Sequence, residues 1–178
     1  MTPLVFNQIS FTATQVGIGI AAAAGLGTFS RFLSGGLLDR KVSCTWIVLA
    51  SCFLFILADS LLFFAKDFDF YFKGQVLIGL AAGLYWPAVE LAVPFSCVSF
   101  SSRRGFALVR SADALGMSLG TFMGSIAASL SLIRSIYIFD CFCMLFLVLL
   151  LTRKPLNSGY TSLSYNERNS LIIDSNHS

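Results

Sequence analysis

Residues 44–65 read CTWIVLASCFLFILADSLLFFA, and Asp59 is the single charged side chain in this stretch. A helix needs about 20 predominantly apolar residues to cross the hydrocarbon core of a lipid bilayer. The stretch is long enough and apolar enough to do so, and we therefore predict that it forms a membrane-spanning helix.

Four further apolar runs of similar length flank this stretch. Short polar or charged breaks separate the runs, so consecutive spans are expected to be antiparallel neighbours. We predict an all-α, polytopic transmembrane helix bundle of about five spans over residues 14–154. An outer segment at 1–13 precedes it, and a disordered cytoplasmic tail at 155–178, rich in Asn, Ser and scattered charge, follows it. The four runs are 14–38, 73–99, 105–130 and 134–151.

The composition excludes several classes of protein. Of the 178 residues, 56% are hydrophobic and 12% are charged, which is too few charges to cover a soluble enzyme of this size. The net charge of +3 is spread over the ends of the apolar runs, so no basic patch for nucleic acid is present. The five cysteines lie in or beside the apolar runs, and His177 is the sole histidine. We therefore expect no metal, no cofactor and no enzymatic activity.

The cations at the ends of the spans set the expected orientation, because cytoplasmic loops carry an excess of Lys and Arg. The segments after the first, third and fifth spans hold twice as many cations as those after the second and fourth. We expect the amino terminus outside and the carboxyl terminus in the cytoplasm, in a plasma or inner membrane. The first group is Arg40, Lys41, Arg103, Arg104, Arg153 and Lys154, and the second is Lys66, Lys73 and Arg134.

Small residues recur at four-residue spacing in three of the spans. Lipid gives helices no hydrophobic reason to associate, so close packing of small residues has to hold them together. The rows therefore predict a compact bundle. Ordinary helix packing explains them, and a further interpretation is that such flat faces slide when a carrier rocks. The rows are Gly17, Ala21 and Gly25; Gly19, Ala23 and Gly27; Gly79 and Gly83; and Gly116, Gly120 and Gly124.

Three segments carry a resemblance to a known family. Residues 35–41, GGLLDRK, resemble the loop signature between the second and third helices of major facilitator superfamily (MFS) transporters. Residues 79–87, GLAAGLYWP, are similar to that family's fourth helix, and Arg104-Gly105 with the later glycines is similar to its fifth. The signature positions are Gly35, Leu37, Asp39 and Arg40.

The resemblance implies a place for each span. If the signature joins helices two and three, the five spans are helices two to six, and the outer segment is the remnant of a lost first helix. Family members have about twelve helices in two halves with the substrate path between them. The chain would then be an incomplete amino-terminal half that lacks the facing wall. Gln75 stands in place of the family's helix-four arginine, and Thr121 stands in place of a proline in the antiporter pattern of the fifth helix, which weakens the case for proton-coupled antiport.

Four ionisable residues are predicted to lie at one depth within the spans. A rise of about 1.5 Å per residue places them roughly 9 to 15 Å from the cytoplasmic edge. Arg110 and Asp113 are three residues apart and can pair on one helix face, while Arg31 and Glu90 would make the buried charge network neutral. We interpret the network mainly as a salt-bridge lock between helices, with a role in proton or substrate passage as the alternative.

Other charges are assigned more peripheral positions. As a hypothesis, Asp39 and Arg40 extend the network and clasp the missing half of the carrier. Asp59 and Asp140 lie nearer the outer ends of their spans, and we expect each to be held at the interface by a nearby cation or a water.

Three residues near the middle of the third span form the predicted substrate cavity. Tyr85 and Trp86 lie away from the membrane interface where such aromatic residues usually gather. One interpretation is that both rings fill core space while Pro87 kinks the helix. The other is that they face a central cavity and stack against an organic substrate.

The sequence thus predicts a membrane carrier that moves a small solute by alternating access, of which this chain is a part. The alternative is a truncated membrane protein that transports nothing and acts only as a helix-bundle partner, or as a gene relic. The expected partners are the lipid bilayer, an unknown small-molecule substrate, and a second carrier half or a second copy of the chain. The sequence does not identify the substrate, the coupling ion or the direction of transport.

Overall fold

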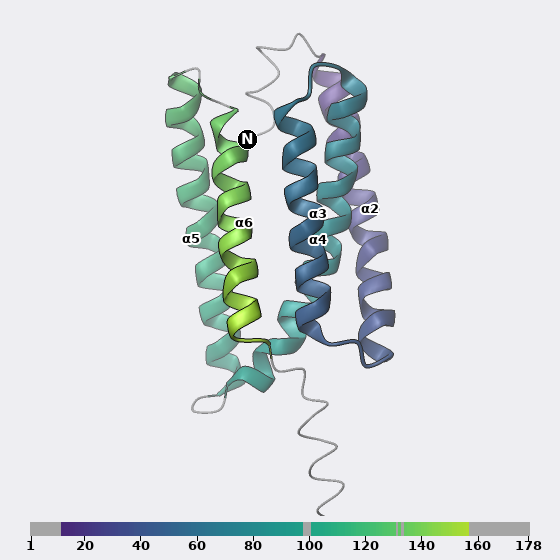
Figure 1. The fold of residues 1–178 in the computed structure, drawn as a ribbon, viewed down its shortest axis with the longest axis vertical. Helices are drawn as coiled ribbons and strands as arrows, with labels where there is room; N and C mark the ends of the chain where they lie inside the picture. Colours follow the sequence, from purple (N-terminus) through teal and green to yellow (C-terminus); the bar gives the residue numbers. More distant parts are fainter. Residues whose placement is uncertain (1–11, 98–100, 131, 133, 157–178) are drawn as a thin grey trace, which may run out of the picture.

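The computed structural model describes residues 12–97, 101–130, 132 and 134–156 of the chain. These residues form five helices and no strand, as the all-α prediction requires (Figure 1). The predicted outer segment and tail fall mostly outside the described residues. The helices are α2 (Ala13–Asp39), α3 (Cys44–Phe63), α4 (Phe68–Ser96), α5 (Ser102–Ser129) and α6 (Ser135–Arg153).

Four of the five helices are long and apolar enough to cross a membrane: α2, α3, α4 and α6. The fourth predicted span, 105–130, corresponds to α5, which is long enough but less apolar. Its first half carries Arg103, Arg104, Arg110 and Asp113, so its apolar residues cover only part of its surface. A helix of this kind is stable beside other membrane helices when its polar side faces protein or water.

The helices begin and end where local sequence favours it. Thr12 caps α2, because its hydroxyl accepts a hydrogen bond from the Gln15 amide at 3.3 Å and the Gln15 side chain accepts one from the Thr12 amide at 3.0 Å. At the other end, Lys41 adopts a left-handed conformation with φ 63°. Its amide donates to the Leu38 carbonyl at 2.9 Å, so the chain turns sharply into α3.

Close backbone contact joins α2 to α4. Methyl groups placed at Gly79 and Gly83 would overlap the backbone carbonyls of Ala23 and Gly27, so these glycines allow the two helices to touch. Two buried serines of α2 add hydrogen bonds across the same contact. The Ser30 hydroxyl donates to the Leu80 carbonyl at 2.8 Å, and the Ser34 hydroxyl donates to the Leu84 carbonyl at 3.1 Å.

The core lies around α3, which packs against α4 on one side and α6 on the other. Its fully buried side chains are small, including Cys44, Val48 and Cys52. The segment after α6 returns to the start of α3, where the Leu156 amide donates to the Thr45 hydroxyl at 2.9 Å. This hydrogen bond ties the end of α6 to α3 although the two residues are far apart in sequence.

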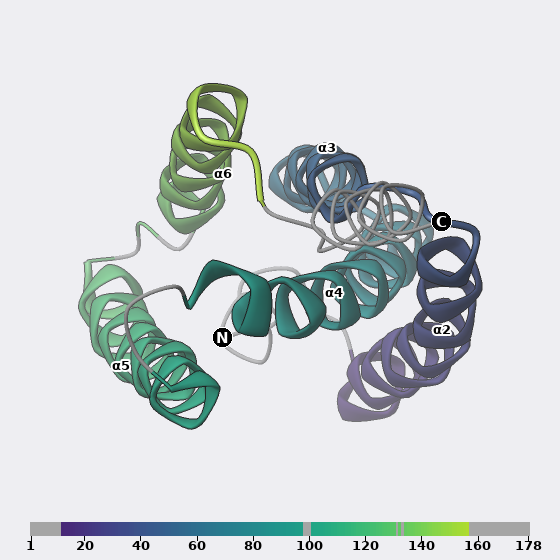
Figure 2. The same cartoon turned by 90° about the horizontal axis from the view of Figure 1, so that it is seen from below.

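Helix α5 stands apart from this core. It makes limited contact with α4 and α6, and no extensive packing joins it to α2 within the described residues. Viewed along the bundle, α2, α3 and α4 form one group, α5 and α6 lie to the other side, and the carboxyl-terminal end of α4 reaches toward α5 (Figure 2). The space flanked by α2, α4 and α5 contains the candidate site.

Candidate functional site

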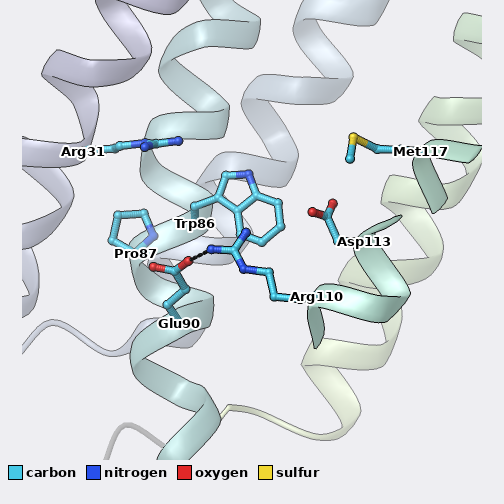
Figure 3. Close-up of a pocket in the computed structure, with 7 residues that line it drawn as sticks. All are labelled: Arg31, Trp86, Pro87, Glu90, Arg110, Asp113 and Met117. Atoms are coloured by element: carbon cyan, nitrogen blue, oxygen red, sulfur yellow. Dashed lines mark hydrogen bonds and ion pairs between the residues drawn. The ribbon is translucent and has the colours of Figure 1, made fainter. Parts of the chain in front are cut away.

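A cavity of about 420 Å³ opens among α2, α4 and α5. All four residues of the predicted charge network line it, so the structure brings together side chains from three helices (Figure 3). They are not buried in this chain, since Arg31 and Arg110 are exposed and Glu90 and Asp113 are half-buried. In this chain taken alone the charges face an open cavity, and their burial within the membrane stays a prediction. The lining residues are Arg31, Trp86, Pro87, Glu90, Arg110, Asp113 and Met117.

An ion pair joins two of these helices. The Arg110 guanidinium on α5 donates to the Glu90 carboxylate on α4 at 2.5 Å, and it also lies 5.1 Å from the centre of the Trp86 ring. The sequence allowed Arg110 to pair with Asp113 on its own helix or to join a lock between helices, and among the described residues it pairs with Glu90. Glu90 and Trp86 together offer Arg110 both a carboxylate and an aromatic face, whereas Asp113 offers a carboxylate alone.

The remaining charges of the cavity have no such partner. Among the described residues, neither Arg31 on α2 nor Asp113 on α5 takes part in an ion pair. Figure 3 shows their side chains entering from opposite sides, with the Trp86 indole between them. The cavity thus holds one neutralised pair and two separate charges of opposite sign.

The predicted aromatic residues divide between the cavity and the core. Trp86 and Pro87 line the cavity. Tyr85 does not, because it packs against the buried cluster around α3 and meets Trp86 edge-on with ring centres 5.5 Å apart. The sequence analysis missed Met117, which also lines the cavity. Its spacing of seven and four residues from Arg110 and Asp113 places all three on one face of α5, and that spacing would have identified it.

The loop-signature residues form the end of α2 and the turn into α3. Asp39 is the last helical residue, and the Arg40 amide donates to the Gly36 carbonyl at 3.3 Å. Both side chains are exposed, and within the described part of the chain neither forms an ion pair. The network therefore does not extend to Asp39 and Arg40 here. Gly35 and Leu37 lie in the last turns of α2, and a methyl group at Gly35 would meet open space.

The predicted packing glycines behave differently in different helices. Gly79 and Gly83 meet Ala23 and Gly27, as described above, and Gly19 of the same row lies against the Tyr71 ring. Methyl groups at Gly116 and Gly120 of α5 would meet no atom within 4 Å, as would those at Gly17 and Gly25 of α2. None of these four positions packs against another helix within the described residues, so helix packing there stays a prediction. Gly124 is buried.

A second polar contact lies between α3 and α6. Asp59 is only 3% exposed, and its carboxyl group is in hydrogen-bond contact with that of Asp140 and 4.0 Å from the Cys141 sulfur. Among the described residues no ion pair joins either aspartate to a cation, so that part of the expectation is not met. An ionised carboxylate can only accept hydrogen bonds, so a contact between two carboxyl groups is favourable when one of them is protonated.

The described residues contain no group of three or more His, Cys, Asp and Glu side chains placed to hold a metal ion. The chemistry available at the cavity is therefore that of its ion pair, its two separate charges and its aromatic ring. Groups of these kinds can bind and orient a solute, and they are typical of a recognition site.

Comparison with known proteins agrees with the helical architecture. No curated protein matches the chain. The family model described as Major Facilitator Superfamily matches residues 1–169, which is nearly the whole chain. Members of that family are transporters, and four apolar helices make this chain an integral, multi-pass membrane protein. On the strength of this match, its all-helical fold and its polar cavity among membrane helices, the chain belongs to the Major Facilitator Superfamily.

Proposed function

We propose that the chain moves a small solute across the membrane by alternating access, and that the cavity among α2, α4 and α5 lies on the solute's path. The observation that carries the proposal is a cavity lined by four charged side chains in a chain of apolar helices. Charged residues within membrane helices are costly, so their gathering at one cavity marks a path for a polar solute or for water.

The facing wall of this path comes from a second carrier half or a second copy of the chain. Arg31 and Arg110 are exposed to the cavity, and α2 and α5 flank it without packing extensively against each other. A partner seated there would enclose the cavity and exclude lipid from its charges. Alternating access then corresponds to rocking of the two walls about the enclosed solute.

We propose an orientation with the amino terminus outside and the carboxyl terminus in the cytoplasm of a plasma or inner membrane. The turn after α2, the start of α5 and the end of α6 lie at one end of the bundle and carry the larger set of cations, which favours that end as the cytoplasmic one. A protease-sensitive tag fused after Ser178 should be protected in intact cells and cleaved in inside-out vesicles. Cleavage in intact cells would reverse the assignment.

Uptake by liposomes containing the purified chain tests the transport proposal. The vesicles would be exposed to a mixture of small organic solutes, washed, and analysed by mass spectrometry. We expect at least one solute to accumulate above the level in protein-free liposomes, and Trp86→Ala to reduce its uptake more than Trp46→Ala does. Trp46 is the matched control, because it lies on α3, is 71% exposed and is not a cavity residue.

Absence of uptake by correctly inserted protein, alone and after co-expression with candidate second halves, would contradict the transport proposal. It would favour the alternative in which the chain serves only as a helix-bundle partner.

A further inference from the structure

The charge arrangement of the cavity restricts the class of solute that it can bind. This inference rests on the proposed function and concerns the same cavity. Glu90 and Arg110 neutralise each other across α4 and α5. Arg31 and Asp113 remain as a separate cation and a separate anion, each without an ion pair among the described residues. A bound solute must therefore face one charge of each sign.

The two separate charges are placed for recognition of a dipolar molecule. Arg31 comes from α2 and Asp113 from α5, and they approach the cavity from opposite sides of the Trp86 indole (Figure 3). A ligand that carries one charge would pair with one side chain and leave the other unpaired. A ligand with both charges can pair with both side chains, so it is favoured over an anion or a cation of the same size.

The body of the ligand must suit the groups between these charges. Arg110 lies against the Trp86 ring. The Trp86 indole offers a flat apolar ligand body a ring and a ring edge to contact. Met117 adds an apolar, flexible side chain on the same helix as Asp113. The volume of about 420 Å³ lies in the range of about 300 to 1,000 Å³ that is typical of small-molecule sites.

We propose that the cavity binds a zwitterionic organic solute whose carboxylate pairs with Arg31 and whose ammonium group pairs with Asp113, with a flat apolar body between them against Trp86. Neither charge alone suffices for full affinity. The ion pair of Glu90 and Arg110 holds α4 and α5 in place around the ligand and does not contact its charged ends.

Three probes of nearly equal size separate the contributions of the two charges. 4-(Aminomethyl)benzoate carries both charges on opposite ends of a benzene ring, 4-methylbenzoate carries only the anion, and 4-methylbenzylamine carries only the cation. Binding would be followed through Trp86 fluorescence in lipid nanodiscs, with a Trp46→Phe background that leaves Trp86 as the single tryptophan of the chain. We expect the zwitterion to bind about tenfold or more tightly than either ion, since each lost pairing costs at least about 1.4 kcal/mol, a tenfold change.

Substitution of Arg31 and substitution of Asp113 should each remove a different part of the preference for the zwitterion. Arg31→Gln should remove the preference for the zwitterion over the cation, and Asp113→Asn should remove its preference over the anion. Arg31→Lys should keep most of the preference, because the positive charge remains. Both residues face an open cavity, and circular dichroism would show whether each variant keeps its helices.

The possible results separate this inference from the transport proposal. Equal binding of the three probes, binding of none, or a preference that survives both Arg31→Gln and Asp113→Asn would overturn the zwitterion inference. If the solute mixture is still taken up in a Trp86-dependent way, transport stands and only the solute class is wrong. If the zwitterion binds as expected and no uptake occurs with any second half, the binding site stands and transport fails.

Discussion

Gly79 of α4 lies directly against the backbone of Ala23 in α2, so that a methyl group at Gly79 would overlap the Ala23 carbonyl. The backbone on both sides leaves no flexible side chain to move aside. Gly79→Ala should therefore destabilise the protein by about 1 to 3 kcal/mol, measured as a lower midpoint of thermal unfolding in detergent. Gly116→Ala is the control, because that position meets open space and alanine favours a helix. A fall in stability for Gly116→Ala equal to that for Gly79→Ala would contradict the packing described.

The ion pair of Glu90 and Arg110 predicts that Arg110 is energetically coupled to Glu90 and to no other carboxylate. The side chains are 42% and 60% exposed, so a double-mutant cycle with Glu90→Gln and Arg110→Gln should give a coupling of about 0.2 to 1 kcal/mol. The same cycle for Arg110 and Asp113 should give none. The exchanged pair, Glu90→Arg with Arg110→Glu, should recover the stability that either single reversal removes. Coupling to Asp113 in place of Glu90 would show that the pairing is wrong.

The contact between Asp59 and Asp140 predicts unequal effects of two substitutions. Asp59→Asn should leave the stability nearly unchanged, because an amide can donate a hydrogen bond to the Asp140 carboxylate. Asp59→Leu leaves Asp140 without this partner, and should cost about 1 to 3 kcal/mol. Asp69→Asn is the control, because Asp69 is exposed in the first turn of α4. Equal loss of stability in Asp59→Asn and Asp59→Leu would argue that the two carboxyl groups are not joined.

The turn between α2 and α3 predicts a stabilising substitution. Lys41 has φ 63°, a conformation that costs a residue with a Cβ about 1 kcal/mol and costs glycine much less. Lys41→Gly should therefore raise the unfolding midpoint. Arg40→Gly has no such strain to relieve, because its φ is −78°, and it should lower the midpoint. A lower midpoint for Lys41→Gly would show that the lysine side chain contributes more than its backbone conformation costs.

The sequence was informative about the helices because crossing a bilayer imposes a length and an apolar composition. Residues 44–65 satisfy both, and α3 occupies nearly the same range. Contacts between helices were harder to predict. The row containing Gly19 and the row containing Gly17 have the same spacing in the same helix, yet only the first meets α4. Which face of α2 touches a neighbour depends on the arrangement of the other helices, and the spacing does not contain that information.

In the candidate site, too, the positions of residues along the helices were predictable and the contacts between helices were not. Helix rise placed Arg31, Glu90, Arg110 and Asp113 at a common depth, and the structure brings all four to one cavity. The partner of Arg110 was not predictable, because a spacing of three residues permits a pair with Asp113 but does not compare it with Glu90 on another helix. The contact of Asp59 with Asp140 was missed for a related reason, since it requires α3 and α6 to be adjacent.

The central claim is that the cavity belongs to a path that opens alternately to the two sides of the membrane. Its most direct test is the reaction of a single cysteine at position 117 with a membrane-impermeant thiol reagent, in a background with all five native cysteines replaced. The account predicts that Met117→Cys reacts from either face of the membrane in separate experiments, whereas Leu149→Cys, at an exposed site on α6 outside the cavity, reacts from neither. Reaction of position 117 from one face only, or from neither, would contradict alternating access.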